Sequence, residues 1–392
     1  MPWDEVLPMD QKSQFVSEYQ RQTVSFSELC QRYSVSRKTG YKWVRRFELD
    51  GRLGLDDRSR RPHSSPNETA RQVREWLVEA RRHHPSWGAK KLLKLVGARH
   101  PGVVLPSRST VCDVLAREGL VRQRVRRRKP SHPGRPMLVA ASPNDLWCVD
   151  FKGQFRTRDG RYCYPLTVTD QYSRYLLACT GLLSPNLEGT KRQFDQLFKE
   201  HGLPAAIRSD NGAPFASTAL ARVSTLSAWW ITLGIVPELT EPGKPQQNGR
   251  HERMHRTLKA ETTRPPEPNL RRQQERFDAF RREYNQVRPH EGIELETPAS
   301  RYTNSERSLA HAPKAITYPA HFETRRVSEN GGIRWHNRWV GVSTTLAGKS
   351  IGLVEVDHEI WDVFFGPIKL GRFLEDRLRI EDDRGRLTRR HV

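Results

Sequence analysis

The spacing of apolar residues changes near residue 144, and this change constrains the fold more than any other feature of the sequence. Before it, apolar residues recur at the three- and four-residue intervals of amphipathic helices. After it, runs of aromatic and β-branched residues typical of strands alternate with helical patterns. Because 392 residues exceed one ordinary hydrophobic core, we expect several domains, all-α before the change and α/β after it.

Three short helices are predicted within residues 1–55. Residues 9–21 carry apolar side chains at helical spacing, and Ser25 opens a second helix with Glu28 in a capping-box pattern. Ser36 is expected to cap a third, basic helix. A short helix, a tight turn and a basic helix are typical of a helix-turn-helix, whose last helix enters the major groove of DNA.

This third helix supplies most of the predicted DNA contacts. They are Ser36, Arg37, Lys38, Thr39, Tyr41, Lys42 and Arg45. Gly40 lies among them, although glycine costs a helix up to about 1 kcal/mol relative to alanine. The alternative is a small helical bundle with a solvated charged face.

A second helical block is predicted over residues 64–121. We expect its first helix to be capped by Ser65 or Asn67 and to bury one apolar face. That face consists of Val73, Trp76, Leu77 and Ala80. Two further helical patterns indicate another helix-turn-helix-like unit, with Arg108 as a DNA contact. A purely structural helical domain is the competing interpretation.

Residues 122–142 are interpreted as a basic linker. The stretch 121–136 contains seven Arg or Lys residues, three prolines and no acid. We expect Arg126, Arg127 and Arg128 to lie on phosphates, the alternative being a solvated connector. Over the whole chain, 67 basic residues against 45 acidic ones give a net charge of +22, which favours a polyanionic partner. A ribosome-associated protein and a general anion binder share that property.

The remainder is predicted to form two domains. Residues 143–303 contain three consecutive strand patterns, then alternating helices and strands, including a helical stretch around Ser217–Trp230. Residues 315–380 return to strands and are expected to form a small β-barrel. Asn330-Gly331 predicts a hairpin between the run ending in Val327 and the run that follows.

Three acids stand out by their positions in the α/β part. Asp150 and Asp210 each end a predicted strand, and Glu252 lies near the start of a helix for which Asn248 is the expected N-cap. Strand ends and helix starts bring side chains together at one edge of an α/β domain. Taken singly, Asp150 could cap a strand end, Asp210 could belong to a turn, and Glu252 could pair with Arg256.

Three clustered carboxylates raise one another's pKa values, and a divalent cation removes that conflict. Mg²⁺ prefers oxygen ligands, and two such ions about 3.5–4 Å apart stabilise both oxygens of a phosphodiester displacement. Arg256 and Lys259 follow Glu252 at i+4 and i+7, on one helix face. We therefore expect these two bases to hold the DNA backbone near a metal site.

These motifs carry a resemblance to a known family. "WCVDFKG", "SDNGAPF" and "GKPQQNGRHERMHRTLK", followed by "YNQVRPHEGIELETPASRY", resemble the integrase catalytic core of bacterial insertion-sequence transposases, in the retroviral-integrase-like DDE group. The motifs occur in order over about 145–302, and "VSRKTGYKWVRRF" resembles the helix-turn-helix of such transposases. The interval from Asp210 to Glu252 is longer than in many relatives, and the zinc-binding His/Cys module of retroviral integrases is absent.

The resemblance implies a fold, cofactors, partners and a reaction. The fold is a ribonuclease H-like α/β core, preceded by all-α helix-turn-helix domains. The cofactor is Mg²⁺ or Mn²⁺, as two ions, on a triad of Asp150, Asp210 and Glu252. The partners are terminal inverted repeats and target DNA, and the protein acts as a homo-oligomer, a dimer or tetramer. The reaction is 3′-end cleavage followed by strand transfer.

Two other functions stay open at this point. One is a metal-dependent DNA nuclease that does not join ends, and the other is a DNA-binding regulator with an inactive core. The five cysteines, Cys30, Cys112, Cys148, Cys163 and Cys179, are scattered, so neither zinc nor disulfides are expected. No apolar run approaches a membrane span, no signal peptide is seen, and we expect a cytoplasmic bacterial protein.

Overall fold

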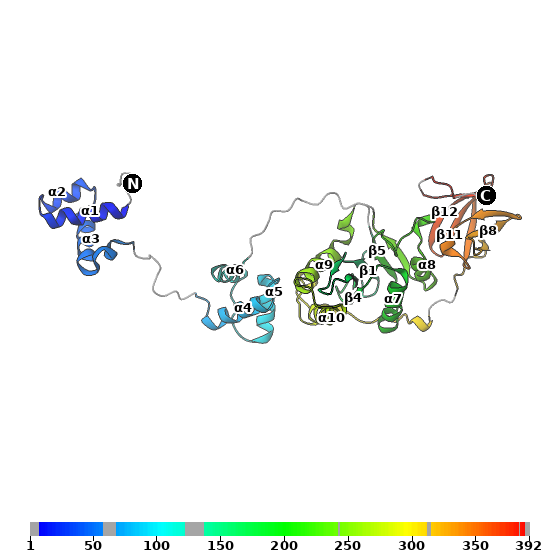
Figure 1. The fold of residues 1–392 in the computed structure, drawn as a ribbon, viewed down its shortest axis with the longest axis horizontal. Coiled ribbons are helices and arrows are strands. Elements are labelled where there is room, and N and C mark those ends of the chain that lie inside the picture. Colours follow the sequence, from blue (N-terminus) through cyan, green and yellow to red (C-terminus); the bar gives the residue numbers. More distant parts are fainter. Residues whose placement is uncertain are drawn as a thin grey trace. The chain divides into compact units, whose positions relative to one another are not determined.

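The computed structural model describes residues 8–57, 68–121, 137–241, 244–311, 315–383 and 385–388 (Figure 1). The chain divides into two compact units, Met1–Thr69 and Ala70–Val392. The second unit contains a helical block, a central α/β domain and a C-terminal β domain. Arg126, Arg127 and Arg128, together with the rest of the predicted linker up to residue 136, lie outside the described residues.

The first unit is a helical bundle. It contains α1 (Pro8–Arg21), α2 (Phe26–Arg32), α3 (Arg37–Asp50) and the 3₁₀ helix η1 (Gly51–Leu55). The predicted helix starts are confirmed, because the Ser25 hydroxyl accepts from the Glu28 amide at 3.3 Å and the Ser36 hydroxyl from the Thr39 amide at 3.2 Å. The residues that fill its core are Phe15, Val16, Leu29, Cys30, Trp43, Val44 and Leu55.

Gly40 is explained by packing. A Cβ atom there would lie 2.8 Å from the Cys30 sulfur and 2.9 Å from the rings of both Phe15 and Phe26. Only glycine lets α3 approach α1 and α2 this closely. Glycine lowers the intrinsic stability of α3, but it allows the three helices to pack closely at this point.

The helical block of the second unit has its own core. It comprises α4 (Arg71–His83), α5 (Ala89–Arg99) and α6 (Arg108–Arg117), packed around Val73, Leu77, Ala80, Trp87, Leu92 and Val111. Trp76 of the predicted face is only partly buried.

The expected cap of the first helix in this block is wrong. Residues 68–70 are not helical, so α4 begins at Arg71 with Ala70 in the N-cap position and no capping side chain. Ser65 and Asn67 lie before this start, outside the described residues. The connection from α5 to α6, residues 100–107, is also longer than the turn of about 3–4 residues in a helix-turn-helix.

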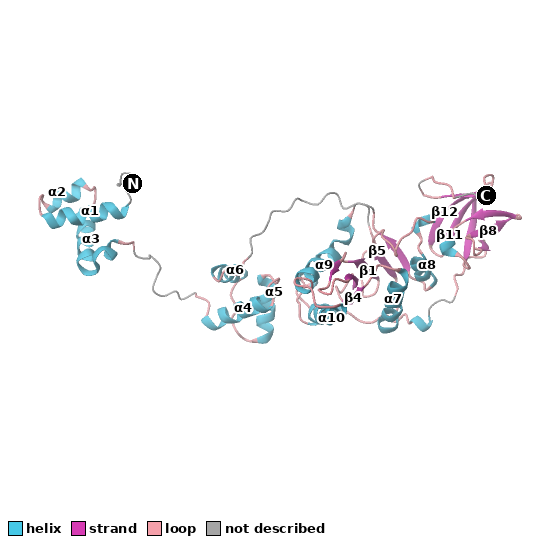
Figure 2. Cartoon of the chain, in the orientation of Figure 1, coloured by secondary structure: helices cyan, strands magenta, loops and turns pink. Residues whose placement is uncertain are grey.

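The central domain is built on a mixed sheet (Figure 2). Its strands are β1 (Leu146–Phe151), β2 (Phe155–Arg156), β3 (Tyr162–Asp170), β4 (Leu176–Leu182), β5 (Ala206–Ser209) and β6 (Val236–Leu239). The main order is β4-β3-β1-β5-β6, antiparallel from β4 to β1 and parallel from β1 to β6, with the short β2 beside β3. This is the ribonuclease H-like arrangement that was expected.

Helices surround this sheet. They are α7 (Leu187–His201), α8 (Thr225–Thr232), α9 (Gly249–Thr262), α10 (Leu270–Gln286) and α11 (Pro298–Arg301), with 3₁₀ turns η2 (Leu220–Arg222), η3 (Pro245–Asn248), η4 (Glu291–Ile293) and η5 (Leu309–His311). The helix α7 buries Phe194, Leu197 and Phe198 and ends at Gly202, whose φ of 77° suits glycine.

The long helix expected around Ser217–Trp230 is wrong in extent. Ala221 has a non-helical φ of 49°, and Ser224 starts α8 through a capping box with Ser227. The apolar residues of the segment serve two cores, which is why they suggested a longer helix. Trp230 packs into the core of the central domain, whereas Ile231 packs into that of the C-terminal domain.

The C-terminal domain contains two antiparallel sheets around one core. A five-stranded sheet has the order β13-β12-β11-β10-β7 and a two-stranded sheet pairs β8 with β9. The strands are β7 (Glu323–Arg326), β8 (Gly332–Trp335), β9 (Arg338–Gly341), β10 (Ser350–Asp357), β11 (Ile360–Phe365), β12 (Ile368–Leu374) and β13 (Arg379–Glu381), with η6 (Thr344–Leu346) between β9 and β10. Closure into a barrel stays a prediction.

The hairpin expected at Asn330-Gly331 is wrong in its pairing. A turn does form there, with φ of 82° at Gly331, but β7 pairs with β10 and β8 pairs with β9. The hairpin turn lies instead at His336-Asn337, both with positive φ. Turn residues specify a local reversal, whereas burial of Ile333 in the common core decides which strand β8 joins.

Candidate active site and DNA-binding surface

Asp150 and Asp210 lie side by side at the ends of neighbouring strands. The parallel register of β1 and β5 pairs Leu146 with Ala206 and Cys148 with Arg208. The same offset, continued beyond the paired residues of the two strands, places Asp150 opposite Asp210. Asp150 is the penultimate residue of β1, and Asp210 follows β5 directly. The sheet thus brings together two of the three predicted acids.

The electrostatics of Asp150 reflect this position. Its side chain is 21% exposed, and burial together with the nearby Asp210 carboxylate raises its pKa to about 7. Glu252 also raises this pKa, by less, while Lys152 lowers it. Two acids that oppose each other's ionisation form a site at which a cation would be favourable.

Asp210 also shapes its own turn. The Gly212 amide donates to its carboxylate at 3.0 Å, and the Asn211 side chain donates to the Thr240 carbonyl at 2.6 Å. The turn considered from the sequence therefore exists. It holds one carboxylate oxygen of Asp210 in place beside Asp150.

Glu252 lies in the first turn of α9 and is exposed. Arg256 and Lys259 are exposed on the same helix, as expected. Among the residues that the structure describes, Glu252 forms no ion pair with Arg256, which contradicts the salt-bridge alternative. Asn248 occupies the N-cap position, but it is buried and makes no capping hydrogen bond, so neither a cap nor an accessible DNA contact is seen there.

The three acids are not gathered into a finished metal site. In the described parts of the chain, no group of three His, Cys, Asp or Glu side chains is arranged to hold a metal ion. Asp150 and Asp210 nonetheless have the oxygen ligands and the mutual repulsion that suit Mg²⁺. Glu252 stands nearby on α9, and its ligand role stays a prediction.

Two buried histidines that sequence reasoning missed fasten α9 to the sheet. The Thr167 hydroxyl of β3 lies 2.7 Å from His251 Nε2 and 2.6 Å from His255 Nε2. His251 Nδ1 lies 2.9 Å from the Thr169 hydroxyl. We call these four residues the α9 clamp. The sequence pattern that could have predicted the clamp is the helical spacing of His251 and His255, which face one way on a helix, together with the alternate spacing of Thr167 and Thr169, which face one way on a strand.

The hydrogen-bond directions in the α9 clamp follow from one proton. The Thr167 hydroxyl has one proton and three polar neighbours, the two Nε2 atoms and the Asp150 carbonyl at 3.0 Å, so at least one imidazole donates to it through Nε2. Burial lowers the pKa of His251 to about 3 and lowers that of His255 as well, so both rings are neutral. The 3.5 Å approach of His255 Nδ1 to the Asp150 carboxylate is accordingly a polar contact and not an ion pair.

The predicted recognition helix has an exposed basic face. Arg37, Lys38, Tyr41, Lys42 and Arg45 are all exposed on α3. Ser36 and Thr39 cap the helix and bond to each other at 2.9 Å, so they shape its start. In the helical block, Arg108 is exposed at the start of α6, after the Ser107 cap.

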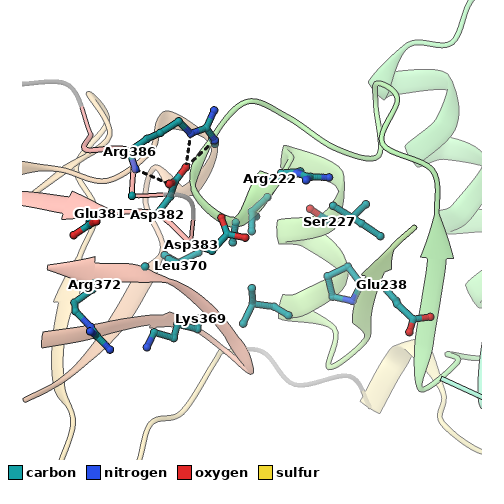
Figure 3. Close-up of a pocket in the computed structure, with 18 of the residues that line it drawn as sticks. Arg222, Ser227, Glu238, Lys369, Leu370, Arg372, Glu381, Asp382, Asp383 and Arg386 are labelled. Atoms are coloured by element: carbon teal, nitrogen blue, oxygen red, sulfur yellow. Dashed lines mark hydrogen bonds and ion pairs between the residues drawn. The ribbon is translucent and has the colours of Figure 1, made fainter. Parts of the chain in front are cut away.

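A cavity of about 740 Å³ lies between the central and C-terminal domains (Figure 3). Side chains of both signs line it, among them Arg222, Lys369, Asp382 and Asp383. None of the three acids of the candidate site belongs to it.

Comparison with known proteins matches four segments to family models. Two integrase core domain models match residues 140–245 and 233–298, a helix-turn-helix domain model matches 11–63, and a homeodomain-like domain model matches 39–115. Residues 140–298 are thus similar to integrase core domains, and residues 11–115 to helix-turn-helix and homeodomain-like domains. The matched core segments contain all three acids of the candidate site.

The relatives include proteins of bacterial insertion elements. The insertion element IS476 uncharacterized 39.2 kDa protein of Xanthomonas euvesicatoria is 29% identical over 57% of this chain and 62% of that protein. The insertion element IS407 uncharacterized 31.7 kDa protein of Burkholderia multivorans is 27% identical over 50% of this chain and 68% of that protein. The chain thus spans about two thirds of the length of these relatives.

Among solved structures, the integrase catalytic core domain of HTLV-2 in complex with magnesium matches 42% of this chain and all of that chain, at 15% identity and a TM-score of 0.34. No helix in the described ranges combines the length and apolar character needed to cross a membrane.

Proposed function

We propose that this protein is a DNA transposase that binds the terminal inverted repeats of its insertion sequence, cleaves their 3′ ends and transfers them into target DNA. One observation carries the proposal. Asp150 and Asp210 lie level at the ends of β1 and β5, beside the helix that bears Glu252 and the exposed bases Arg256 and Lys259. The integrase core family and the helix-turn-helix unit of the same chain support it.

Asp150, Asp210 and Glu252 are the proposed ligands of two Mg²⁺ or Mn²⁺ ions. The raised pKa of Asp150 supports this, because it comes from burial and from the neighbouring Asp210 carboxylate, and a bound cation would favour the ionised form against both. Such ions supply charge stabilisation for the attacking and leaving oxygens of a phosphodiester displacement.

The protein itself positions the substrate. Arg256 and Lys259 are proposed to bind backbone phosphates next to the acids, and the α9 clamp keeps their helix on the sheet. The basic face of α3 is proposed to read the repeat, with Arg108 as a second contact. Because two element ends must be joined, we propose a homo-oligomer, a dimer or tetramer, on double-stranded DNA.

Asp210→Asn tests this proposal. It should leave binding to the repeats unchanged, because Asp210 is remote in the chain from the helix-turn-helix, and should abolish both 3′-end cleavage and joining in Mg²⁺. Glu188→Gln on α7, an exposed acid, is the matched control and should retain both activities. Joining by the Asp210→Asn variant would refute the metal-ligand assignment.

Two outcomes for the unmodified protein would support the alternatives. Cutting without joining would identify a nuclease. Binding to the repeats without metal-dependent cutting would identify a regulator, which would also tolerate loss of Glu252.

A further inference from the structure

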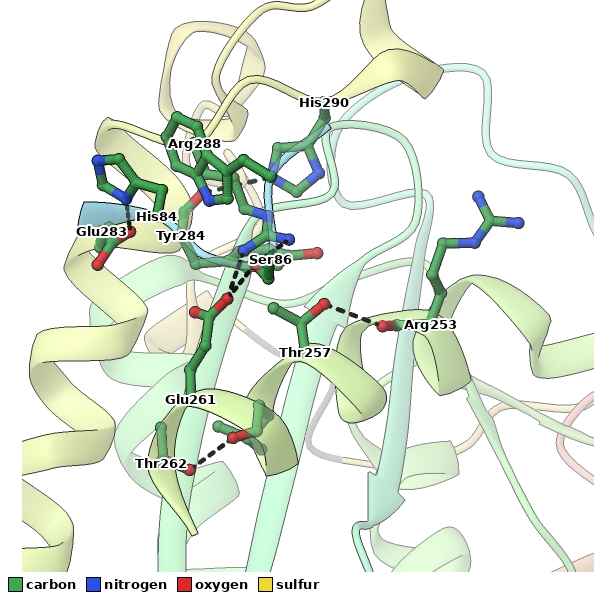
Figure 4. Close-up of polar contacts among 12 residues, drawn as sticks. His84, Ser86, Arg253, Thr257, Glu261, Thr262, Glu283, Tyr284, Arg288 and His290 are labelled. Atoms are coloured by element: carbon green, nitrogen blue, oxygen red, sulfur yellow. Dashed lines mark hydrogen bonds and ion pairs between the residues drawn. The ribbon is translucent and has the colours of Figure 1, made fainter. Parts of the chain in front are cut away.

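The central domain presents three glutamates to one short segment of the helical block (Figure 4). They come from α9, α10 and η4 and are Glu261, Glu283 and Glu291. The segment is residues 84–90, between α4 and the first turn of α5. We call the three glutamates the acidic face.

Each glutamate has a partner of complementary chemistry. His84 Nδ1 lies 2.9 Å from the Glu283 carboxylate, and the Lys90 ammonium lies 3.3 Å from that of Glu291. The hydrogen bond from His84 lowers the pKa of Glu283. In a chain of net charge +22, three acids that all face donors of one segment form a specific electrostatic match.

The centre of the contact is the most buried part. The Ser86 hydroxyl donates to Glu261 at 2.5 Å, and Arg288, itself 7% exposed, contacts the same carboxylate oxygen at 3.1 Å. The Arg288 guanidinium also lies 5.8 Å from the ring of Trp87, which is fully buried in the helical block. Figure 4 shows Arg288 and Ser86 meeting at the Glu261 carboxylate.

Glu261 lies on α9, the helix that carries Glu252. The α9 clamp fastens the first half of this helix to the sheet, and Glu261 fastens its last turn to Arg288 and Ser86. The second anchor therefore depends partly on the helical block. This agrees with the division of the chain, which groups the helical block with the central domain.

We propose that the acidic face is a docking surface for residues 84–90 of the same chain, and that the docked helical block steadies the last turn of α9. The occupant is the segment itself, because its three polar side chains match the three glutamates one for one. The effect on catalysis rests on the proposed role of Glu252, whereas the docking itself is independent of that role. Since partly exposed ion pairs are weak, the docking is reversible.

Lys90→Glu tests the docking in the full chain. It places an acid against Glu291 but keeps α5, because a negative charge in the first turn of a helix is favourable. Hydrogen exchange of the amides of residues 84 and 86–88, since Pro85 has none, followed by mass spectrometry, should accelerate about three- to tenfold. The double variant Lys90→Glu/Glu291→Lys should restore exchange to within about twofold of the unmodified protein.

Arg192→Glu is the control, since it places a like charge against Glu188 within α7 in the same way, and it should leave the amides of residues 84 and 86–88 unchanged. Unchanged exchange in Lys90→Glu, or no recovery in the double variant, would overturn the docking. Protection that falls on dilution would overturn it too, because the occupant would then be a second copy. Failure of the proposed function would appear as absent DNA cleavage and would leave these exchange rates as expected.

Discussion

Thr167→Val offers a direct test of how α9 is held against the sheet of the central domain. Valine keeps the shape and the β-branched character of threonine, so β3 and its packing should persist. The change removes the hydroxyl that contacts His251 and His255 and that donates to the Asp150 carbonyl.

The magnitude follows from the polar atoms that are left behind. His251 and His255 are 2% and 4% exposed, so their Nε2 atoms would lose the Thr167 hydroxyl as hydrogen-bond partner without access to water. Each buried unsatisfied donor or acceptor costs about 1–3 kcal/mol, which gives a loss of about 2–6 kcal/mol for the pair. That is a large part of the typical stability of a domain, about 5–15 kcal/mol.

Hydrogen exchange of α9 amides in the full chain is the assay. At 1.36 kcal/mol per tenfold, the lower limit corresponds to exchange about 30-fold faster in α9. Thr167→Ser is the matched control, because it retains the hydroxyl and loses only a methyl group, worth about 1 kcal/mol. If the valine and serine variants exchange at the same rate, the hydrogen-bond reasoning is refuted.

Two further predictions concern the first unit. Gly40→Ala should destabilise the first unit by up to about 2 kcal/mol, because overpacking against Cys30, Phe15 and Phe26 costs about 1–3 kcal/mol and the better helix former returns about 1 kcal/mol; hydrogen exchange in α1–α3 measures this, and stronger protection than in the unmodified protein would contradict it. Lys42→Ala should weaken binding to the repeats and lower the salt slope of the binding constant by about one, as measured by fluorescence anisotropy over a salt series; a slope equal to that of the unmodified protein would show that Lys42 contacts no phosphate.

Local signals in the sequence were enough to predict many elements. The caps Ser25 and Ser36 are set by bonds within one turn, so the starts of α2 and α3 could be predicted. The strands that carry Asp150 and precede Asp210 could be found because apolar runs are a local property as well.

Other features depend on contacts that are distant in the sequence. The pairing of β7 with β10 is decided by a core shared among strands far apart in the chain, which the turn at Gly331 cannot specify. The α9 clamp was missed because His251 and His255 stand among bases in the sequence, and only the fold turns them toward β3. The acidic face is likewise assembled from three separate elements.

The central claim is metal-dependent cutting and joining at element ends by Asp150, Asp210 and Glu252. The most direct measurement is to incubate the full chain with the DNA that flanks its own gene, with and without Mg²⁺, and to map every cut and joined end by sequencing. The account predicts 3′ cuts at the repeat ends and new junctions with target DNA, both only in the presence of Mg²⁺ and absent in Asp210→Asn. Cuts and junctions that persist in chelator, or in that variant, would contradict it.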